Sequence, residues 1–251
     1  MPDISNLLAI AKSAAVEAGG LLSRAGLDRF SYSKELPKEV KSLADEVLDQ
    51  AILSVLSKTG FGILSEESGY IPGSQPGGHR FIVDPLDGTF NFLKNLGPCA
   101  VSIAFWDANK PVFGVVFDIA KKSLFWGGAE LGAWRDGDEI RVSDTCKVSE
   151  ASICTGFPVR FDLSAGNALK AFQERVSEFS KVRMLGSAAS SLACVADGRA
   201  DAYFEEDIML WDVAAGIAIV EGAGGRVHWE SKLGRPGLHV YADNGCLGGH
   251  L

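Results

Sequence analysis

Two carboxylates and a glycine turn follow directly after a short apolar run in the segment 81–92, FIVDPLDGTFNF. The acids are Asp84 and Asp87, and Gly88 comes next. Acids, proline and glycine are frequent in turns, so a plain turn is one interpretation. The order Asp-Pro-Leu-Asp-Gly-Thr also suits a site, because Pro85 has no N–H to satisfy and a helix starting near Gly88 would direct free amides outward. Such amides carry partial positive charge and favour a phosphate.

Three more acids stand where a strand is predicted to end or a helix to begin. Glu66 follows the strand predicted at 61–64. Asp212 opens the apolar segment WDVAAGIAIVEGAGG, and Asp45 lies in the first turn of another predicted helix. Each alone is typical of a helix cap or dipole partner. Packed together without metal ions, such acids would raise one another's pKa and destabilise the fold. Hard divalent cations relieve this repulsion, and Mg²⁺ commonly combines a few carboxylates with phosphate and water.

Two other acidic motifs are excluded by their spacing. The LDGT string also occurs in haloacid dehalogenase phosphatases, whose nucleophilic Asp lies two residues before the Asp-Gly-Thr acid; here Pro85 holds that position. An EF-hand is excluded because no D-x-D-x-D-G with a downstream Glu occurs. The four histidines also lack the spacing of metal ligands; they are His79, His228, His239 and His250.

The composition is typical of a globular protein that does not bind nucleic acid. Of the 251 residues, 47% are hydrophobic and 22% are charged, and the net charge of −8 comes without any cluster of Lys and Arg. A nucleic-acid binder would show a basic face. The five scattered cysteines have no C-x-x-C spacing, which argues against a disulfide framework or a zinc site and indicates a reducing compartment. No long uncharged apolar run or signal-peptide pattern occurs, so we expect no membrane span and a cytoplasmic location.

The elements that could position these acids are predicted in two blocks. In the first block, 1–145, apolar spacings of three and four predict helices over 4–25 and 43–58, and apolar runs predict strands at 61–64 and 80–83. Between 99 and 142 the predicted strands are CAVSIAFW, PVFGVVFD, SLFWGG and EIRVS. In the second block, 146–251, we predict strands at 152–157, 201–206, 225–229 and 238–243, and helices near 164–180, 187–198 and 210–225. We expect two α/β subdomains within one structural unit, with helices layered against sheets.

Three motifs resemble the inositol monophosphatase family, a branch of the Mg²⁺-dependent, lithium-sensitive phosphomonoesterases. DPLDGTFNF is similar to the first signature of the family, and WDVAAGIAIVEGAGG is similar to the second. ILSEES matches the acidic strand end that precedes the first signature. The resemblance runs along essentially the whole chain. It implies a layered α/β/α/β/α sandwich, two or three Mg²⁺ per active site, a small phosphorylated polyol or sugar as substrate, and a homodimer as a frequent assembly.

The resemblance also implies a role for each matching residue. The Mg²⁺ ligands would be Glu66, Asp84, the backbone carbonyl of Leu86, Asp87 and Asp212. The residues that position and help to activate the attacking water would be Glu66, Thr89 and Asp45. The substrate would contact Asp87 and the amides of Gly88 and Thr89 on its phosphate side. Its alcohol half would contact Gly186, Ser187, Ala188 and Glu205.

One departure and two alternative functions accompany the resemblance. The family usually has a Val-Thr pair shortly before the helical Asp, and this chain has Lys41-Ser42 instead. A 3′(2′),5′-bisphosphate nucleotidase would share the chemistry, but such relatives commonly follow Asp-Gly-Thr with Lys-Glu-Phe where this chain has Phe90-Asn91-Phe92. A catalytically silent phosphate binder of the same fold is the third interpretation, and a missing ligand position would favour it. None of the five ligand positions is missing.

Overall fold

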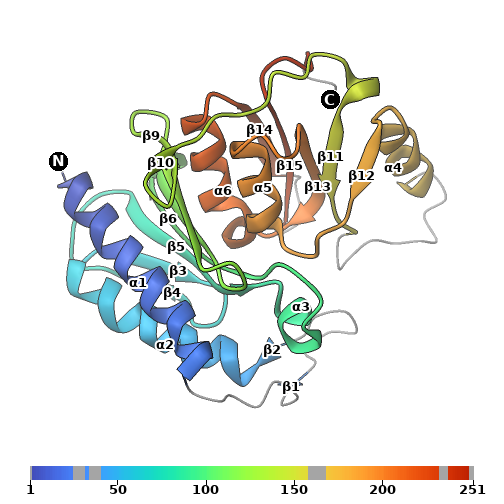
Figure 1. The fold of residues 1–251 in the computed structure, drawn as a ribbon. Helices are drawn as coiled ribbons and strands as arrows, with labels where there is room; N and C mark the ends of the chain where they lie inside the picture. The colour runs from blue at the N-terminus through green and yellow to red at the C-terminus, as the bar shows by residue number, and fades with distance from the viewer. Residues whose placement is uncertain (1, 25–31, 34–40, 158–167, 232–236, 249–251) are drawn as a thin grey trace.

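The protein is a five-layered sandwich of helices and sheets (Figure 1). The computed structural model describes residues 2–24, 32–33, 41–157, 168–231 and 237–248. The first layer holds α1 (Ile4–Arg24) and α2 (Leu43–Leu56), and an eight-stranded sheet follows. The middle layer holds α5 (Ala188–Ala196) and α6 (Leu210–Gly222). A five-stranded sheet and α4 (Ala168–Ser177) complete the order, which confirms the predicted α/β/α/β/α fold.

The eight-stranded sheet is built from the first half of the chain. Its order is β10-β9-β8-β7-β6-β5-β3-β4, and only the β3–β5 pair is parallel. The strands are β3 (Gly62–Ser65), β4 (Gly69–Ile71), β5 (His79–Asp87), β6 (Ala100–Asp107), β7 (Lys110–Asp118), β8 (Ser123–Gly128), β9 (Gly132–Arg135) and β10 (Asp138–Glu139). A two-stranded ribbon, β1 (Tyr32–Ser33) with β2 (Lys41–Ser42), leads into α2. The short helix α3 (Thr89–Lys94) follows β5.

The five-stranded sheet belongs to the second half. Its order is β12-β11-β13-β15-β14, with the β11 pairs parallel and the other pairs antiparallel. The strands are β11 (Ser152–Thr155), β12 (Lys181–Arg183), β13 (Ala202–Ile208), β14 (Arg226–Ser231) and β15 (Leu238–Asp243). Two 3₁₀ turns, Ser57–Thr59 and Val148–Glu150, lie outside both sheets. Within the described residues, no helix has the length and apolar character needed to cross a membrane.

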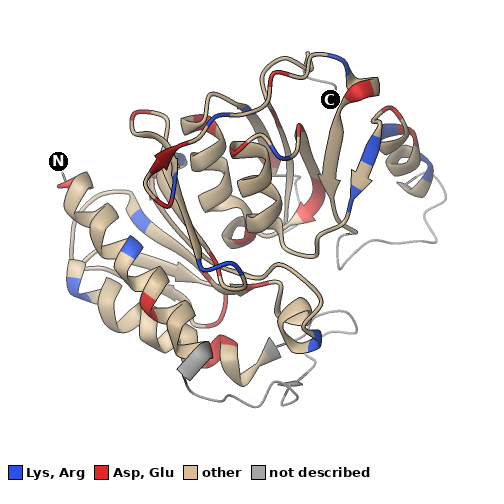
Figure 2. Ribbon diagram, in the orientation of Figure 1, with Lys and Arg blue, Asp and Glu red and all other residues tan. Residues whose placement is uncertain are grey.

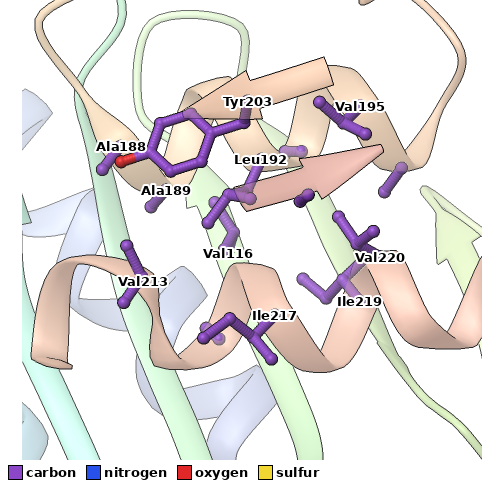
Figure 3. Packing of buried hydrophobic residues seen from close by; sticks show 14 of the residues in the cluster. Val116, Ala188, Ala189, Leu192, Val195, Tyr203, Val213, Ile217, Ile219 and Val220 are labelled. Carbon is purple, nitrogen blue, oxygen red and sulfur yellow. The ribbon is translucent and has the colours of Figure 1, made fainter. Parts of the chain in front are cut away.

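Helix α6 lies against the eight-stranded sheet at very short range. Gly114 of β7 makes this approach possible, because a Cβ there would lie 2.1 Å from the carbonyl oxygen of Ala215. The indole of Trp106 on β6 donates a hydrogen bond to the carbonyl of Ala214 at 3.3 Å. On its other side α6 packs against α5 and contacts β14 and β15, and Figure 3 shows Val213 and Ile217 of α6 in the hydrophobic cluster there. These contacts fix where the first turn of α6 lies over the sheet.

Most predicted elements are present, and one strand prediction is wrong. Strand β5 is longer than 80–83, because it continues through a register shift between Asp84 and Asp87. The strand expected at EIRVS contains sheet pairing only at Asp138–Glu139. The chain then leaves the sheet edge, and the amide of Val142 donates to the carbonyl of Ala223 at the end of α6 instead.

Two other predictions meet the described residues only in part. The helix expected near 164–180 is described from Ala168 to Ser177, and 158–167 lies outside the described residues. The two sheets divide between β10 and β11, on either side of the predicted boundary at residue 145. Helix α5 contacts strands of both sheets. The division into subdomains 1–145 and 146–251 therefore stays a prediction.

Candidate active site

Three carboxylates from three different elements converge at one point. Glu66 follows β3, Asp84 lies in β5, and Asp212 lies in the first turn of α6. One carboxylate oxygen of each lies within 4.8 Å of the others. Among the described residues, these are the three acidic, His or Cys side chains that lie closely enough together to share a metal ion. Figure 2 shows further acidic residues at the start of α2 and along the end of β13.

The sheet itself brings Glu66 and Asp84 together. Strands β3 and β5 are parallel neighbours in which Ser65 pairs with Val83. The residues that follow this pair, Glu66 and Asp84, therefore lie side by side. The amide of Glu66 donates to the carbonyl of Val83 at 3.0 Å, which holds its backbone beside β5. Asp84 Oδ1 accepts from the amide of Leu86 at 2.9 Å. The backbone therefore fixes where both side chains begin, and through the amide of Leu86 it also holds the carboxylate of Asp84.

Burial makes the negative charges of this group costly. It raises the pKa of Asp84 well above its ordinary value, and the charges of Glu66 and Asp87 raise that pKa further. Burial raises the pKa of Glu66 to about 7. Burial, followed by the charge of Glu66, also raises the pKa of Asp212 well above its ordinary value. A cation would offset these costs, and carboxylate oxygens are the donors that Mg²⁺ prefers, so the residues fit a hard divalent ion.

Asp87 faces the start of α5. Its Oδ2 accepts from the hydroxyl of Ser187 at 2.5 Å and from the amide of Ala189 at 2.8 Å, and its Oδ1 accepts from the amide of Ala188 at 3.3 Å. Burial raises the pKa of Asp87 to about 6, against the lowering effect of these hydrogen bonds. The structure thus joins Asp87 to the predicted substrate residues Ser187 and Ala188. Its assignment as a metal ligand stays a prediction.

Thr89 and Asp45 form a hydrogen-bonded pair at the start of α3. Thr89 Oγ1 lies 2.7 Å from Asp45 Oδ1 and 3.0 Å from the carbonyl oxygen of Leu86. The second oxygen of Asp45 accepts from the amide and the hydroxyl of Ser42 at 2.8 and 2.6 Å. Ser42 therefore orients Asp45 from the position before α2. The side chain of Lys41, the unusual residue beside it, lies outside the described residues.

Gly88 and Gly186 allow the α3 and α5 segments to meet. Gly88 has a φ of 88°, and a Cβ there would lie 3.0 Å from the carbonyl oxygen of Pro98 and 3.1 Å from that of Gly186. Gly186 has a φ of 72°. Asn91 of α3 donates to the carbonyls of Pro98 and Leu185 at 2.9 and 2.7 Å. Sequence reasoning missed this role of Asn91, because no local pattern shows partners 94 residues away.

Glu205 lies at the edge of the same site. Tyr203 donates from its hydroxyl to Glu205 Oε2 at 3.0 Å. Burial raises the pKa of Glu205 to about 7, and the charge of Asp87 contributes to this increase. Gly156 leaves room for the carboxylate, since a Cβ there would lie 2.6 Å from one of its oxygens. A polar acceptor of this kind suits hydrogen bonds to hydroxyl groups.

Comparisons with known proteins show which proteins the chain as a whole is similar to. A family model described as "Inositol monophosphatase family" matches residues 3–245. An inositol-1-monophosphatase of Mesorhizobium japonicum is 38% identical over 227 residues, which cover 89% of this chain and 85% of that protein. A Nus factor SuhB of Xylella fastidiosa is 36% identical, covering 85% of this chain and 78% of that protein. The crystal structure of the extragenic suppressor protein suhB from Bartonella henselae has a TM-score of 0.86 and 35% identity, covering 96% of this chain and 95% of that one.

Proposed function

The chain belongs to the inositol monophosphatase family and is a phosphatase, and from this we propose that it is a Mg²⁺-dependent phosphomonoesterase for a small phosphorylated polyol or sugar. The family is metal-dependent. The observation that carries the proposal is the convergence of Glu66, Asp84 and Asp212 within 4.8 Å. Buried acids with strongly perturbed pKa values cluster at functional sites.

We assign the Mg²⁺ ligands to residues that the chain brings to the ends of β3 and β5 and to the start of α6. They are Glu66, Asp84, the carbonyl of Leu86, Asp87 and Asp212, and they would hold two or three ions. When bound, these ions would neutralise phosphoryl oxygens and lower the pKa of a water molecule. This chemistry needs no covalent enzyme intermediate, in agreement with Pro85 at the position of the haloacid dehalogenase nucleophile.

Two side chains are proposed to position the attacking water. The hydroxyl of Thr89 is within hydrogen-bonding distance of Asp45 Oδ1, at 2.7 Å. When Thr89 donates to Asp45, its own oxygen is left to accept a hydrogen from water. Glu66 is proposed to help to activate this water by taking up its proton. The amides of Gly88 and Thr89 would bind the phosphate.

The alcohol half of the substrate is proposed to lie between α5 and β13. Glu205 can accept hydrogen bonds from hydroxyl groups, and Gly186, Ser187 and Ala188 would line the opposite wall. A site built on such bonds discriminates against analogues that lack the hydroxyls. The name of the Mesorhizobium relative refers to inositol monophosphate, which supports a polyol. A bisphosphate nucleotide would require further cations for its second phosphate.

A side-by-side assay tests the substrate class. Phosphate release is measured in Mg²⁺ for inositol 1-phosphate, several sugar monophosphates and adenosine 3′,5′-bisphosphate. We expect kcat/KM for an inositol or sugar monophosphate to exceed that for the bisphosphate at least about tenfold, a difference of ~1.4 kcal/mol in transition-state free energy. The reverse ranking would favour the nucleotidase. Phosphate release from none of the compounds, by a protein that binds Mg²⁺, would favour the silent binder.

Three further properties are proposed from family membership. They are inhibition by lithium, a cytoplasmic location and a homodimeric assembly. The scattered cysteines, without C-x-x-C spacing, are typical of a reducing compartment.

A further inference from the structure

The buried carboxylate of Asp49 on α2 accepts hydrogen bonds from two serine hydroxyls, close to the cluster formed by Glu66, Asp84 and Asp212. Asp49 is 2% exposed. Its Oδ1 accepts from the hydroxyl of Ser65 at 2.5 Å, and its Oδ2 accepts from the hydroxyl of Ser68. Both of its oxygens are therefore engaged by O–H donors that lie 16 and 19 residues away in sequence.

The two serines stand at the ends of the turn that carries Glu66. Ser65 is the last residue of β3, and it pairs with Gly69, the first residue of β4. Only residues 66–68 connect the two strands. The amide of Glu66 is bound to the carbonyl of Val83 at 3.0 Å. A single carboxylate thus holds the turn at both ends, while β5 holds its first amide.

Helix α2 connects this turn to the other half of the site. Asp45 lies four residues before Asp49, so the two carboxylates share one face of the helix, one turn apart. Asp45 contacts the hydroxyl of Thr89 at 2.7 Å, and Asp49 binds the serines that flank Glu66. Leu48 is buried on this helix, which packs against β5. One rigid helix therefore sets Glu66 and Thr89 relative to each other.

We propose that Asp49 is a positioning residue, which sets the affinity of the site for divalent cations by fixing the Glu66 turn through Ser65 and Ser68. The inference rests on the proposed metal-dependent function. Partners that orient metal ligands typically contribute 10–100-fold to metal affinity. An asparagine at position 49 would present an NH₂ group in place of one acceptor oxygen. It could then accept from only one of the two hydroxyls on its carbonyl side.

A matched control separates positioning from general stability. Asp201 is also buried, and it accepts from the hydroxyl of Ser143 at 2.6 Å and from the amide and hydroxyl of Ser152 at 2.6 and 2.9 Å. It lies just before β13, four residues from Glu205, which is about 13 Å along an extended strand. Asp201→Asn therefore replaces a buried carboxylate that also accepts from two serine hydroxyls, but at a position away from Glu66, Asp84 and Asp212.

The experiment is calorimetric titration of the substrate-free protein with Mg²⁺ alone. We expect Asp49→Asn to raise the Kd for Mg²⁺ at least about tenfold. Asp201→Asn should lower the melting temperature but leave the Kd within about twofold of wild type. Ser68→Ala removes one of the two hydroxyls at a residue that is itself exposed, and should raise the Kd about threefold or more. It provides a second variant if Asp49→Asn fails to fold.

An activity measurement adds a second readout. In Asp49→Asn, the Mg²⁺ concentration for half-maximal phosphate release should rise at least about tenfold, while kcat at saturating Mg²⁺ stays within a few-fold of wild type. Unchanged Mg²⁺ affinity in a folded Asp49→Asn or Ser68→Ala protein would overturn the positioning role and leave the proposed function standing. Absence of Mg²⁺ binding by the wild-type protein would instead overturn the proposed function, and the positioning role with it.

Discussion

Replacing Asp84 with asparagine should make the metal-free protein more stable near neutral pH. Asp84 is 1% exposed, and burial and its acidic neighbours raise its pKa well above 3.8. The native state therefore keeps a proton that the unfolded chain releases. An asparagine at this position keeps an acceptor for the amide of Leu86, which lies 2.9 Å from Asp84 Oδ1, and presents an NH₂ group to Glu66 and Asp212. It is thus a neutral substitute for the protonated acid.

Proton linkage gives the size and the sign of this effect. Because the native state binds more protons than the unfolded state, the free energy of unfolding falls as pH rises, by about 1.4 kcal/mol per pH unit for each retained proton. The loss begins near the ordinary value of 3.8 and ends at the raised native pKa. Asp84→Asn should recover this loss, and each kcal/mol recovered corresponds to about 2–4 °C in melting temperature.

The assay is urea unfolding in EDTA at pH 5, 6, 7 and 8, analysed by linear extrapolation. The stability gained by Asp84→Asn should increase from pH 5 towards pH 7. Asp138→Asn, a change of the same kind at an exposed position on β10, should show a curve parallel to wild type. If Asp84→Asn gave a curve parallel to wild type, or lower stability at pH 7, the account of crowded buried acids would be wrong.

Two more substitutions distinguish individual contacts of the site. Asp87→Asn should raise the stability of the metal-free protein at pH 7, as Asp84→Asn does. Burial raises the pKa of Asp87 to about 6 despite the hydrogen bonds that it accepts at the start of α5, and a neutral amide removes the cost of the buried charge; urea unfolding in EDTA checks this. Phosphate release by Asp87→Asn in Mg²⁺ should fall at least ~10³-fold, because the change removes a charge that the proposed metal site uses. Gly88→Ala should lower the melting temperature more than Gly137→Ala does. Both have positive φ values, 88° and 102°, but a Cβ at Gly88 meets the carbonyl of Pro98 at 3.0 Å, while none of the described atoms lies within 4 Å of one at Gly137. Equal losses in a thermal scan would contradict the close contact.

Local sequence patterns were sufficient for the elements that carry Glu66 and Asp84. Each acid follows an apolar run, and the runs form the parallel neighbours β3 and β5. The strand predicted at 238–243 is β15 with the same bounds. In each case the periodicity of a few neighbouring residues determines the local structure, so no distant contact is needed to predict it.

The meeting of distant segments could not be predicted from such patterns. Asp212 lies beside Glu66 and Asp84 only because α6 packs closely on β7, where Gly114 has no side chain to prevent the contact. Asp87 binds the start of α5, about 100 residues further along the chain. Asp49 was not singled out, because an acid on a helix is usually exposed. Tertiary packing determines these positions, and it cannot be predicted from the type of a single residue or its neighbours in the sequence.

The strand expected at EIRVS failed for a related reason. Its alternating side chains suit a strand, and Ile140 is indeed buried. The backbone of Val142 is instead satisfied by the carbonyl of Ala223, at the end of a helix in the middle layer. Periodicity reports which side chains become buried, but it does not identify the partner of the backbone amide.

The most direct test of the central claim is phosphate release from inositol 1-phosphate by wild-type protein in EDTA and after Mg²⁺ is restored. The account predicts no turnover in EDTA and full recovery with Mg²⁺. Asp212→Asn, which alters the acid that α6 contributes, should remain inactive at the same Mg²⁺ concentration. Full turnover in metal-free buffer, or an Asp212→Asn protein as active as wild type, would contradict the claim that these three carboxylates form the metal site of a phosphatase.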